Sequence, residues 1–357
     1  MQNKSKTTIL LGAGAMIPYG GPKTEELSDR LLVNSSCRQL FEHIKNDIKG
    51  TCNFETMLCA LEQILEWKIA ASNSNSDNDV FTKMLKPCFE YKNTFSRSDL
   101  WAIYVEAVNE IIERVKEYDC YPPSCPIKRE ELANFILNKS RKSALKIYTL
   151  NYDRLIPKII NQVGGEIYEG ISNQEFNYDI ETFVNQKLTH YNLHGSIYNS
   201  YKPGKGVTLS DIPISFYHQY FIEGGNPQEQ KIFLPIITGY SKSQRIISEP
   251  FNFGLGTFMY DCNTSDKFVV AGYSFGDPHI NSILKKFVKK ESTDIVIIDY
   301  SKNHTVFPDC FRKYAYQAFN IPQSQFNKIK DGEYKEKSSC LSVYLKGIET
   351  YIKENSK

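Results

Sequence analysis

The chain has 357 residues, of which 41% are hydrophobic and 24% charged, and this balance is typical of an ordinary globular protein. Its net charge of +2 gives no electrostatic basis for a nucleic-acid-binding surface. Apolar runs fall short of the ~18 residues that a transmembrane helix requires, and the start MQNKSKTTILLG lacks the small-residue cleavage site of a signal peptide. Nine cysteines form no staple or zinc-ribbon pattern, which predicts reduced thiols in a cytoplasmic protein without a metal.

The first predicted elements are a buried strand, a glycine turn and a helix. The apolar run at residues 7–11 breaks at Gly12-Ala13-Gly14, and helical periodicity resumes near Thr24. In doubly wound folds this order brings backbone amides against a pyrophosphate. The third glycine of G-x-G-x-x-G is replaced by Ile17, so a plain tight turn is an equal alternative for this stretch taken alone.

The next hundred residues are predicted to be mainly helical. Apolar residues recur at helical spacing in four segments, at about 24–48, 53–67, 100–116 and 131–140. Asn53 is a candidate N-cap for the second of these helices. Polar residues at 71–79 and the cysteine- and proline-containing stretch at 120–126 predict loops. We therefore expect a helical insertion over residues 31–140, whose apolar stripes are core rather than a cofactor site.

Strand patterns then follow one another, at residues 145–150, 187–193, 268–273 and 294–300. The tail is predicted to form two helices around a polar loop at 323–339. These elements predict an α/β fold, with a Rossmann-like, doubly wound parallel sheet, a mainly helical insertion and a short helical C-terminal tail. The predicted division is a sheet domain of residues 1–30 and 141–310, the insertion at 31–140 and the tail at 311–357.

Polar residues follow three of the predicted strands, as Asn151, His194 and Ser274. In open parallel sheets the carboxyl ends of the strands face the ligand crevice, so these side chains are predicted to meet there. Each has a purely structural alternative. Asn151 suits a turn after a strand, a lone histidine before glycine is more often structural than catalytic, and Asp277-Pro278 suits a helix N-cap followed by its first residue. Their joint placement at strand ends favours a nucleotide site.

The motifs GAGAMIPYGGP, TLNYD, LHGS and GYSFGDPHIN, in this order, resemble those of the SIR2-like (sirtuin-type) NAD-binding family. The similarity is to the bacterial branch that acts in anti-phage defence, and it spans residues 7–300. The resemblance implies that NAD+ is the substrate and that Asn151, Asp153 and His194 form the catalytic group. It further implies that the dinucleotide is bound by Gly12, Ala13, Gly14, Ala15, Gly272, Ser274, Asp277 and Asp299.

The chemistry of these side chains is consistent with cleavage of a glycosidic bond. Loss of nicotinamide from NAD+ leaves an oxocarbenium-like sugar, so the reaction needs an oriented water and hydrogen bonds to the ribose rather than an acid. An asparagine amide both donates and accepts, and can hold water and ribose together. A histidine can accept a proton from a hydroxyl group or water, and Asp153 can favour developing positive charge. His279 is a weaker candidate than His194.

The sequence also departs from the sirtuin deacylases, which carry a cysteine-based zinc module and a Pro-Asp-Phe-Arg segment. Here the glycine turn continues GGPKTEEL and no Cys-x-x-Cys pair exists, which disfavours an acyl-lysine substrate. The resulting expectation is an NAD+ glycohydrolase that depletes NAD+ as a defence effector. By resemblance, a homo-oligomer and a HerA-type hexameric ATPase partner are expected. ADP-ribosyl transfer, deacylation and a non-catalytic scaffold that senses NAD or ADP-ribose remain the alternatives.

Overall fold

The computed structural model of the chain describes most of the sheet and the helices around it. The described residues are 5–34, 38–47, 52–73, 95–120, 126–202, 205–213, 236–238, 246–289, 292–301, 318–319, 333–335 and 341–356. The predicted loops at 71–79 and 120–126 lie largely outside this part of the chain.

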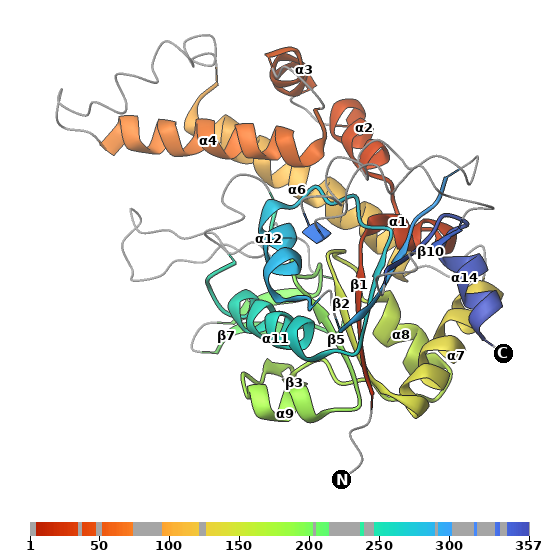
Figure 1. Ribbon diagram of the computed structural model, residues 1–357. Coiled ribbons are helices and arrows are strands. Elements are labelled where there is room, and N and C mark those ends of the chain that lie inside the picture. The colour runs from red at the N-terminus through yellow and green to blue at the C-terminus, as the bar shows by residue number, and fades with distance from the viewer. Residues whose placement is uncertain are drawn as a thin grey trace.

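A seven-stranded sheet with the order β10-β11-β9-β8-β1-β2-β5 forms the centre of the structure (Figure 1). Its neighbouring strands are parallel except for the antiparallel pair β10–β11. The strands are β1 (Lys6–Leu11), β2 (Ala144–Thr149), β5 (Leu188–Asn192), β8 (Lys267–Ala271), β9 (Asp294–Ile298), β10 (Glu333–Lys335) and β11 (Leu341–Tyr344). The chain runs outward from β1 through β2 to β5, and then returns to β8 on the other side of β1. This confirms the predicted doubly wound sheet, with its switch point between β1 and β8.

Helices cover both faces of the sheet (Figure 1). One face carries α7 (Pro126–Lys142), α8 (Leu155–Gln162) and α14 (Ile348–Asn355), and the other carries α9 (Ile180–Asn185), α11 (Phe251–Thr264) and α12 (Pro278–Phe287). Alternation along β1 divides its side chains between two cores. Leu10 packs with Tyr148 and Phe258 on the α11 face, whereas Leu11 packs with Ile156 on the α8 face.

The remaining long helices form a layer above the carboxyl ends of the strands, at the end of the sheet away from the N-terminus (Figure 1). They are α2 (Thr24–Asn34), α3 (Arg38–Asp47), α4 (Phe54–Asn73) and α6 (Arg97–Cys120), and they share an apolar core of their own. The single helix predicted at 24–48 is therefore two helices in the structure. Asn53 is the predicted N-cap of α4, and its Oδ1 accepts a hydrogen bond from the Thr56 amide at 3.0 Å. Helix α7 packs with the sheet instead of this layer, and the predicted boundary at residue 140 falls inside it.

The described part of the C-terminal tail contains two strands and a helix, whereas the sequence predicted two helices around a polar loop. The first of these predicted helices lies largely outside the described residues. Strand β11 pairs in parallel with β9, and β10, which pairs with β11, lies inside the predicted polar loop. Helix α14 follows β11. The sequence LSVY of β11 buries Leu341, Val343 and Tyr344, and four residues are too few for a helical period to be distinguished from a strand.

A small antiparallel sheet was also not predicted. It consists of β3 (Ile171–Ser172), β4 (Glu175–Phe176), β7 (Gly206–Leu209) and β6 (Asn199–Lys202).

Two further expectations concern the membrane and the cysteines. Among the described residues, no helix has both the length and the apolar character needed to cross a membrane. Within the same part of the chain, Cys52, Cys59 and Cys262 are free thiols.

Candidate functional site

The glycine turn after β1 is in direct contact with the turn after β8. The Gly12 amide donates to the Ala271 carbonyl and the Gly14 amide to the Gly272 carbonyl, each at 2.9 Å. A Cβ atom on Gly12 would lie 2.5 Å from the Gly272 carbonyl oxygen, and Gly272 has a left-handed φ of +58°. Only glycine allows this close approach of two backbones, which places the two turns side by side at the switch point of the sheet.

A cavity of about 550 Å³ opens above these turns, and most of the predicted site residues line it. They come from the ends of β1, β2, β8 and β9 and from the turn after β5. The lining members of the predicted set are Gly12, Ala13, Gly14, Asn151, Asp153, His194, Gly272, Ser274, Asp277 and Asp299. Ala15 is not among the lining residues, because it is fully buried and its amide donates to the Gly12 carbonyl at 3.1 Å.

Asn151 joins the turn after β2 to the glycine turn. Its Nδ2 donates to the Gly12 carbonyl at 3.4 Å, and its amide donates to Thr149 Oγ1 at 3.1 Å. The turn itself is held by Asn192, whose Nδ2 donates to the carbonyls of Asn151 and Asp153, both at 2.8 Å. Asn192 was not predicted to be important. The signal that could have indicated it is a polar side chain at the last position of an otherwise buried strand.

His194 is 2% exposed and faces a second histidine. Its Nε2 lies 3.2 Å from Nε2 of His279, which is in the first turn of α12. At this distance one ring nitrogen donates and the other accepts, so His279 influences the tautomer of His194. One nitrogen of each histidine and a carboxylate oxygen of Asp277 lie within 4.8 Å of one another, which is a donor set that could hold a metal ion. His279 is therefore in direct contact with His194, which the sequence did not indicate.

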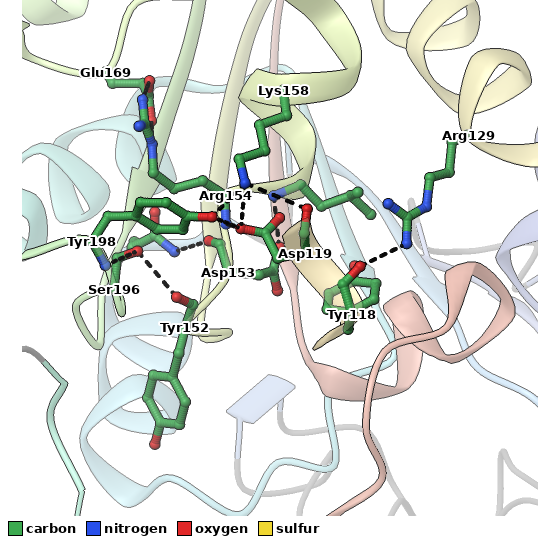
Figure 2. Close-up of polar contacts among 12 residues, drawn as sticks. Tyr118, Asp119, Arg129, Tyr152, Asp153, Arg154, Lys158, Glu169, Ser196 and Tyr198 are labelled. Atoms are coloured by element: carbon green, nitrogen blue, oxygen red, sulfur yellow. Dashed lines mark hydrogen bonds and ion pairs between the residues drawn. The ribbon is translucent and has the colours of Figure 1, made fainter. Parts of the chain in front are cut away.

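Asp153 lies at the floor of the cavity and is 6% exposed. Burial, and then the nearby carboxyl group of Asp119, raise its pKa to about 7. Its Oδ1 accepts a hydrogen bond from the Leu155 amide at 2.9 Å, at the start of α8. Figure 2 shows Asp153 together with Asp119, Lys158 and Tyr198 in one polar cluster.

The β8 and β9 side of the cavity carries the residues predicted for the rest of the nucleotide. Asp277 occupies the N-cap position of α12 and Pro278 its first position, as predicted. Asp299 follows β9 and accepts a hydrogen bond from the Tyr300 amide at 2.8 Å. Burial raises the pKa of the Asp299 carboxyl group to about 6. With Asp153, this makes two cavity carboxyl groups that hold a proton more readily than exposed ones do.

The helical layer supplies the outer wall of the cavity, which the sequence did not reveal. Its lining residues are Thr24, Glu25 and Leu27 of α2, Phe54 and Glu55 of α4 and Val115 and Tyr118 of α6, with Lys23 and Asn53 just outside these helices. Five carboxyl groups and a single lysine are among the lining side chains. Glu55 is close enough to Tyr152 and Tyr273 to raise the pKa of both hydroxyl groups, although burial is the larger cause for each.

Comparison with known proteins identifies the family. Residues 145–319 match the family described as SIR2-like domain. A search of curated proteins gives no match. Among solved structures, a complex of a Sir2 homologue mutant with ADP ribose is 12% identical, with a TM-score of 0.42, and the match covers 90% of this chain and 89% of that chain.

Two further matches are similarly distant. The structure of Sir2Tm bound to a propionylated peptide is 12% identical with a TM-score of 0.42, and the match covers 98% of this chain and 90% of that chain. A Sir2 homolog–NAD complex is 13% identical with a TM-score of 0.38, and the match covers 83% of this chain and 79% of that chain. Structural likeness of this degree carries no functional argument, so the assignment depends on the domain match. Residues 145–319 of the chain therefore form a SIR2-like domain.

Proposed function

We propose that the protein is an NAD+ glycohydrolase, which cleaves NAD+ to nicotinamide and ADP-ribose and acts as an anti-phage effector by depleting NAD+. The observation that carries the proposal is the meeting of Asn151 and His194 with the glycine turn in one cavity of about 550 Å³. That volume is within the range of pockets that bind small molecules and cofactors. The SIR2-like domain match supports NAD+ as the ligand.

The proposed mechanism assigns roles to the glycine turn, to Asn151 and to His194. Backbone at Gly12, Ala13 and Gly14 holds the pyrophosphate, and Asn151 orients the ribose and the attacking water. His194 accepts the proton of that water, and its contact with His279 at 3.2 Å supports a defined tautomer for this role. No general acid is required, because the nicotinamide ring is positively charged in NAD+ and leaves as a neutral molecule.

Water is the proposed acceptor because α2, α4 and α6 supply the outer wall of the cavity. ADP-ribosyl transfer, deacylation and NAD sensing on a scaffold are the competing functions. A homo-oligomer in the cytoplasm with a HerA-type ATPase partner is part of the proposal, and it is based on the resemblance to the defence branch alone.

Product analysis in water enriched in ¹⁸O tests the proposal. Purified protein, alone and with its genomic-neighbour partner, is incubated with NAD+ and the products are identified by mass spectrometry. We expect one nicotinamide per ADP-ribose, with ¹⁸O at the anomeric carbon. ADP-ribose attached to protein would establish transfer instead. NAD+ binding by calorimetry without turnover under either condition would establish the sensing scaffold.

A further inference from the structure

Two buried carboxyl groups belong to one cluster of polar side chains, and one of them, Asp153, also lines the cavity. Asp119 is at the end of α6 and Asp153 is in the turn between β2 and α8, and they are 5% and 6% exposed. The closeness of Asp119 is one of the two main causes of the raised pKa of Asp153. Figure 2 shows both groups in one cluster of polar side chains.

The oxygens of Asp119 are unequally satisfied. Its Oδ2 accepts hydrogen bonds from the Tyr198 hydroxyl group at 2.6 Å and from Lys158 Nζ at 3.0 Å, and a longer one from the Arg154 amide at 3.4 Å. Its Oδ1 is buried and has no hydrogen-bond partner. A buried carboxylate oxygen without a donor is costly, so this atom is the natural acceptor for a proton held by a neighbouring acid.

The cations around the pair do not neutralise both carboxyl groups. Arg154, which precedes α8, donates two hydrogen bonds to Glu169, one of them 3.0 Å long. Arg129 of α7 donates to the carbonyls of Tyr19 and Tyr118, both at 2.9 Å. Lys158 forms an ion pair with Asp119, with Nζ 3.0 Å from Oδ2. Arg129 lowers the pKa of Asp153, but burial and Asp119 raise it by more.

The hydroxyl groups facing the pair do not change this balance. Tyr198 also contacts Lys158, and the buried Tyr118 hydroxyl group has no hydrogen-bond partner. Asp153 and Asp119 both raise the pKa of Tyr118, after the larger effect of burial, so this phenol stays neutral. Two adjacent buried carboxylates with one bound cation cannot both be ionised at low cost.

We propose that Asp119 and Asp153 share one proton at mildly acidic pH and release it near neutrality, and that Asp119 is a positioning residue that keeps Asp153 neutral where it lines the cavity. The raised pKa of Asp153, about 7, supports the same assignment. As the two groups interact, this titration belongs to the pair.

The consequence for function follows from the charge of the cavity and rests on the proposed NAD+ substrate. Glu25, Glu55, Asp277 and Asp299 also line the cavity, and a pyrophosphate is anionic. Because the proton is shared with Asp119, a neutral Asp153 removes one repulsive charge from the cavity without needing a cation there.

Infrared difference spectroscopy tests the shared proton without any need for turnover. The carbonyl band of a protonated carboxyl group is recorded for the wild type minus Asp153→Asn, from pH 5 to pH 8.5. We expect a protonated band at pH 6 that disappears around pH 7. Absence of the band throughout this range would overturn the inference. Because no NAD+ is present, this outcome is independent of whether the proposed enzymatic activity exists.

Variants with opposite charge effects separate this assignment from a merely structural role. Asp119→Asn removes the neighbouring negative charge and should lower the midpoint of the band by about 1 pH unit or more, whereas Lys158→Met removes the cation and should raise it. Tyr198→Phe is the matched control, since it removes a hydroxyl group without changing formal charge, and its shift should be smaller. Unmoved midpoints, or shifts in one direction for both charge variants, would refute the proposal. Lys158→Met keeps the test decisive if Asp119→Asn fails to fold.

Discussion

Replacing Gly272 with alanine should destabilise the fold and separate the two turns that carry the cavity. The added Cβ would lie 1.9 Å from the Ala15 amide nitrogen and 2.3 Å from the Gly14 carbonyl carbon, both of which are backbone atoms that cannot rotate away. The left-handed conformation at φ +58° costs alanine about 1–2 kcal/mol. Overpacking adds about 1–3 kcal/mol, so the free energy of unfolding should fall by roughly 2–5 kcal/mol.

Denaturant unfolding measures this loss, and Gly164→Ala is its matched control. Gly164 has a similar φ of +75°, and a Cβ there would meet no atom within 4 Å. The control should therefore show only the conformational cost of about 1–2 kcal/mol. Equal losses for the two variants would refute the argument that steric contact between the turns, and not glycine conformation alone, holds the site together.

Three further predictions concern stability. Asp153 binds a proton in the folded state up to about pH 7, whereas the unfolded group releases it near its ordinary value of 3.8. The contribution of Asp153 to stability is therefore largest at acidic pH, and this contribution should fall from pH 4 to pH 7 by up to about 1.4 kcal/mol per pH unit. Chemical denaturation across this range should show that slope reduced in Asp153→Asn, and identical slopes would contradict it. Asn192→Ala removes two hydrogen bonds of 2.8 Å and should lower the free energy of unfolding by about 1–3 kcal/mol. Amide exchange in the turn after β2 should become faster. Unchanged exchange there would contradict the role of Asn192 in holding this turn. Lys6→Met leaves the fully buried Asp261 carboxylate without its 2.7 Å ion pair and should lower the free energy of unfolding by about 3–5 kcal/mol. Lys267→Met removes the exposed ion pair with Asp294 and should lower it by under about 1 kcal/mol. Similar melting temperatures for the two variants would contradict this difference.

The sequence was sufficient to predict β1, β2, β8 and β9 because each of these strands contains a short run of apolar residues. β1, β2, β8 and β9 lie within a residue or two of their predicted positions, since strands covered on both faces contain few polar residues. The predicted meeting of Asn151 and His194 also follows from parallel topology, which brings the carboxyl ends of the strands to one edge.

Features that depend on tertiary packing could not be predicted. The tail strand β11 is four residues long and its strand character comes from pairing with β9. Asp119 is an ordinary acidic residue near a helix end in the sequence, and only the fold places it beside Asp153. Likewise, the spacing of His194 and His279 along the chain gives no indication that their rings meet at 3.2 Å.

Nicotinamide release from NAD+ by Asn151→Ala, compared with Asn138→Ala, tests the central claim most directly. Both changes remove an asparagine side chain, but Asn151 lines the cavity and Asn138 is exposed on α7. With wild type and His194→Ala assayed alongside, and with the genomic-neighbour partner present, we expect wild-type release from Asn138→Ala and none from the two cavity variants. Release that persists in Asn151→Ala and His194→Ala at the wild-type rate would contradict the assignment of the reaction to this cavity.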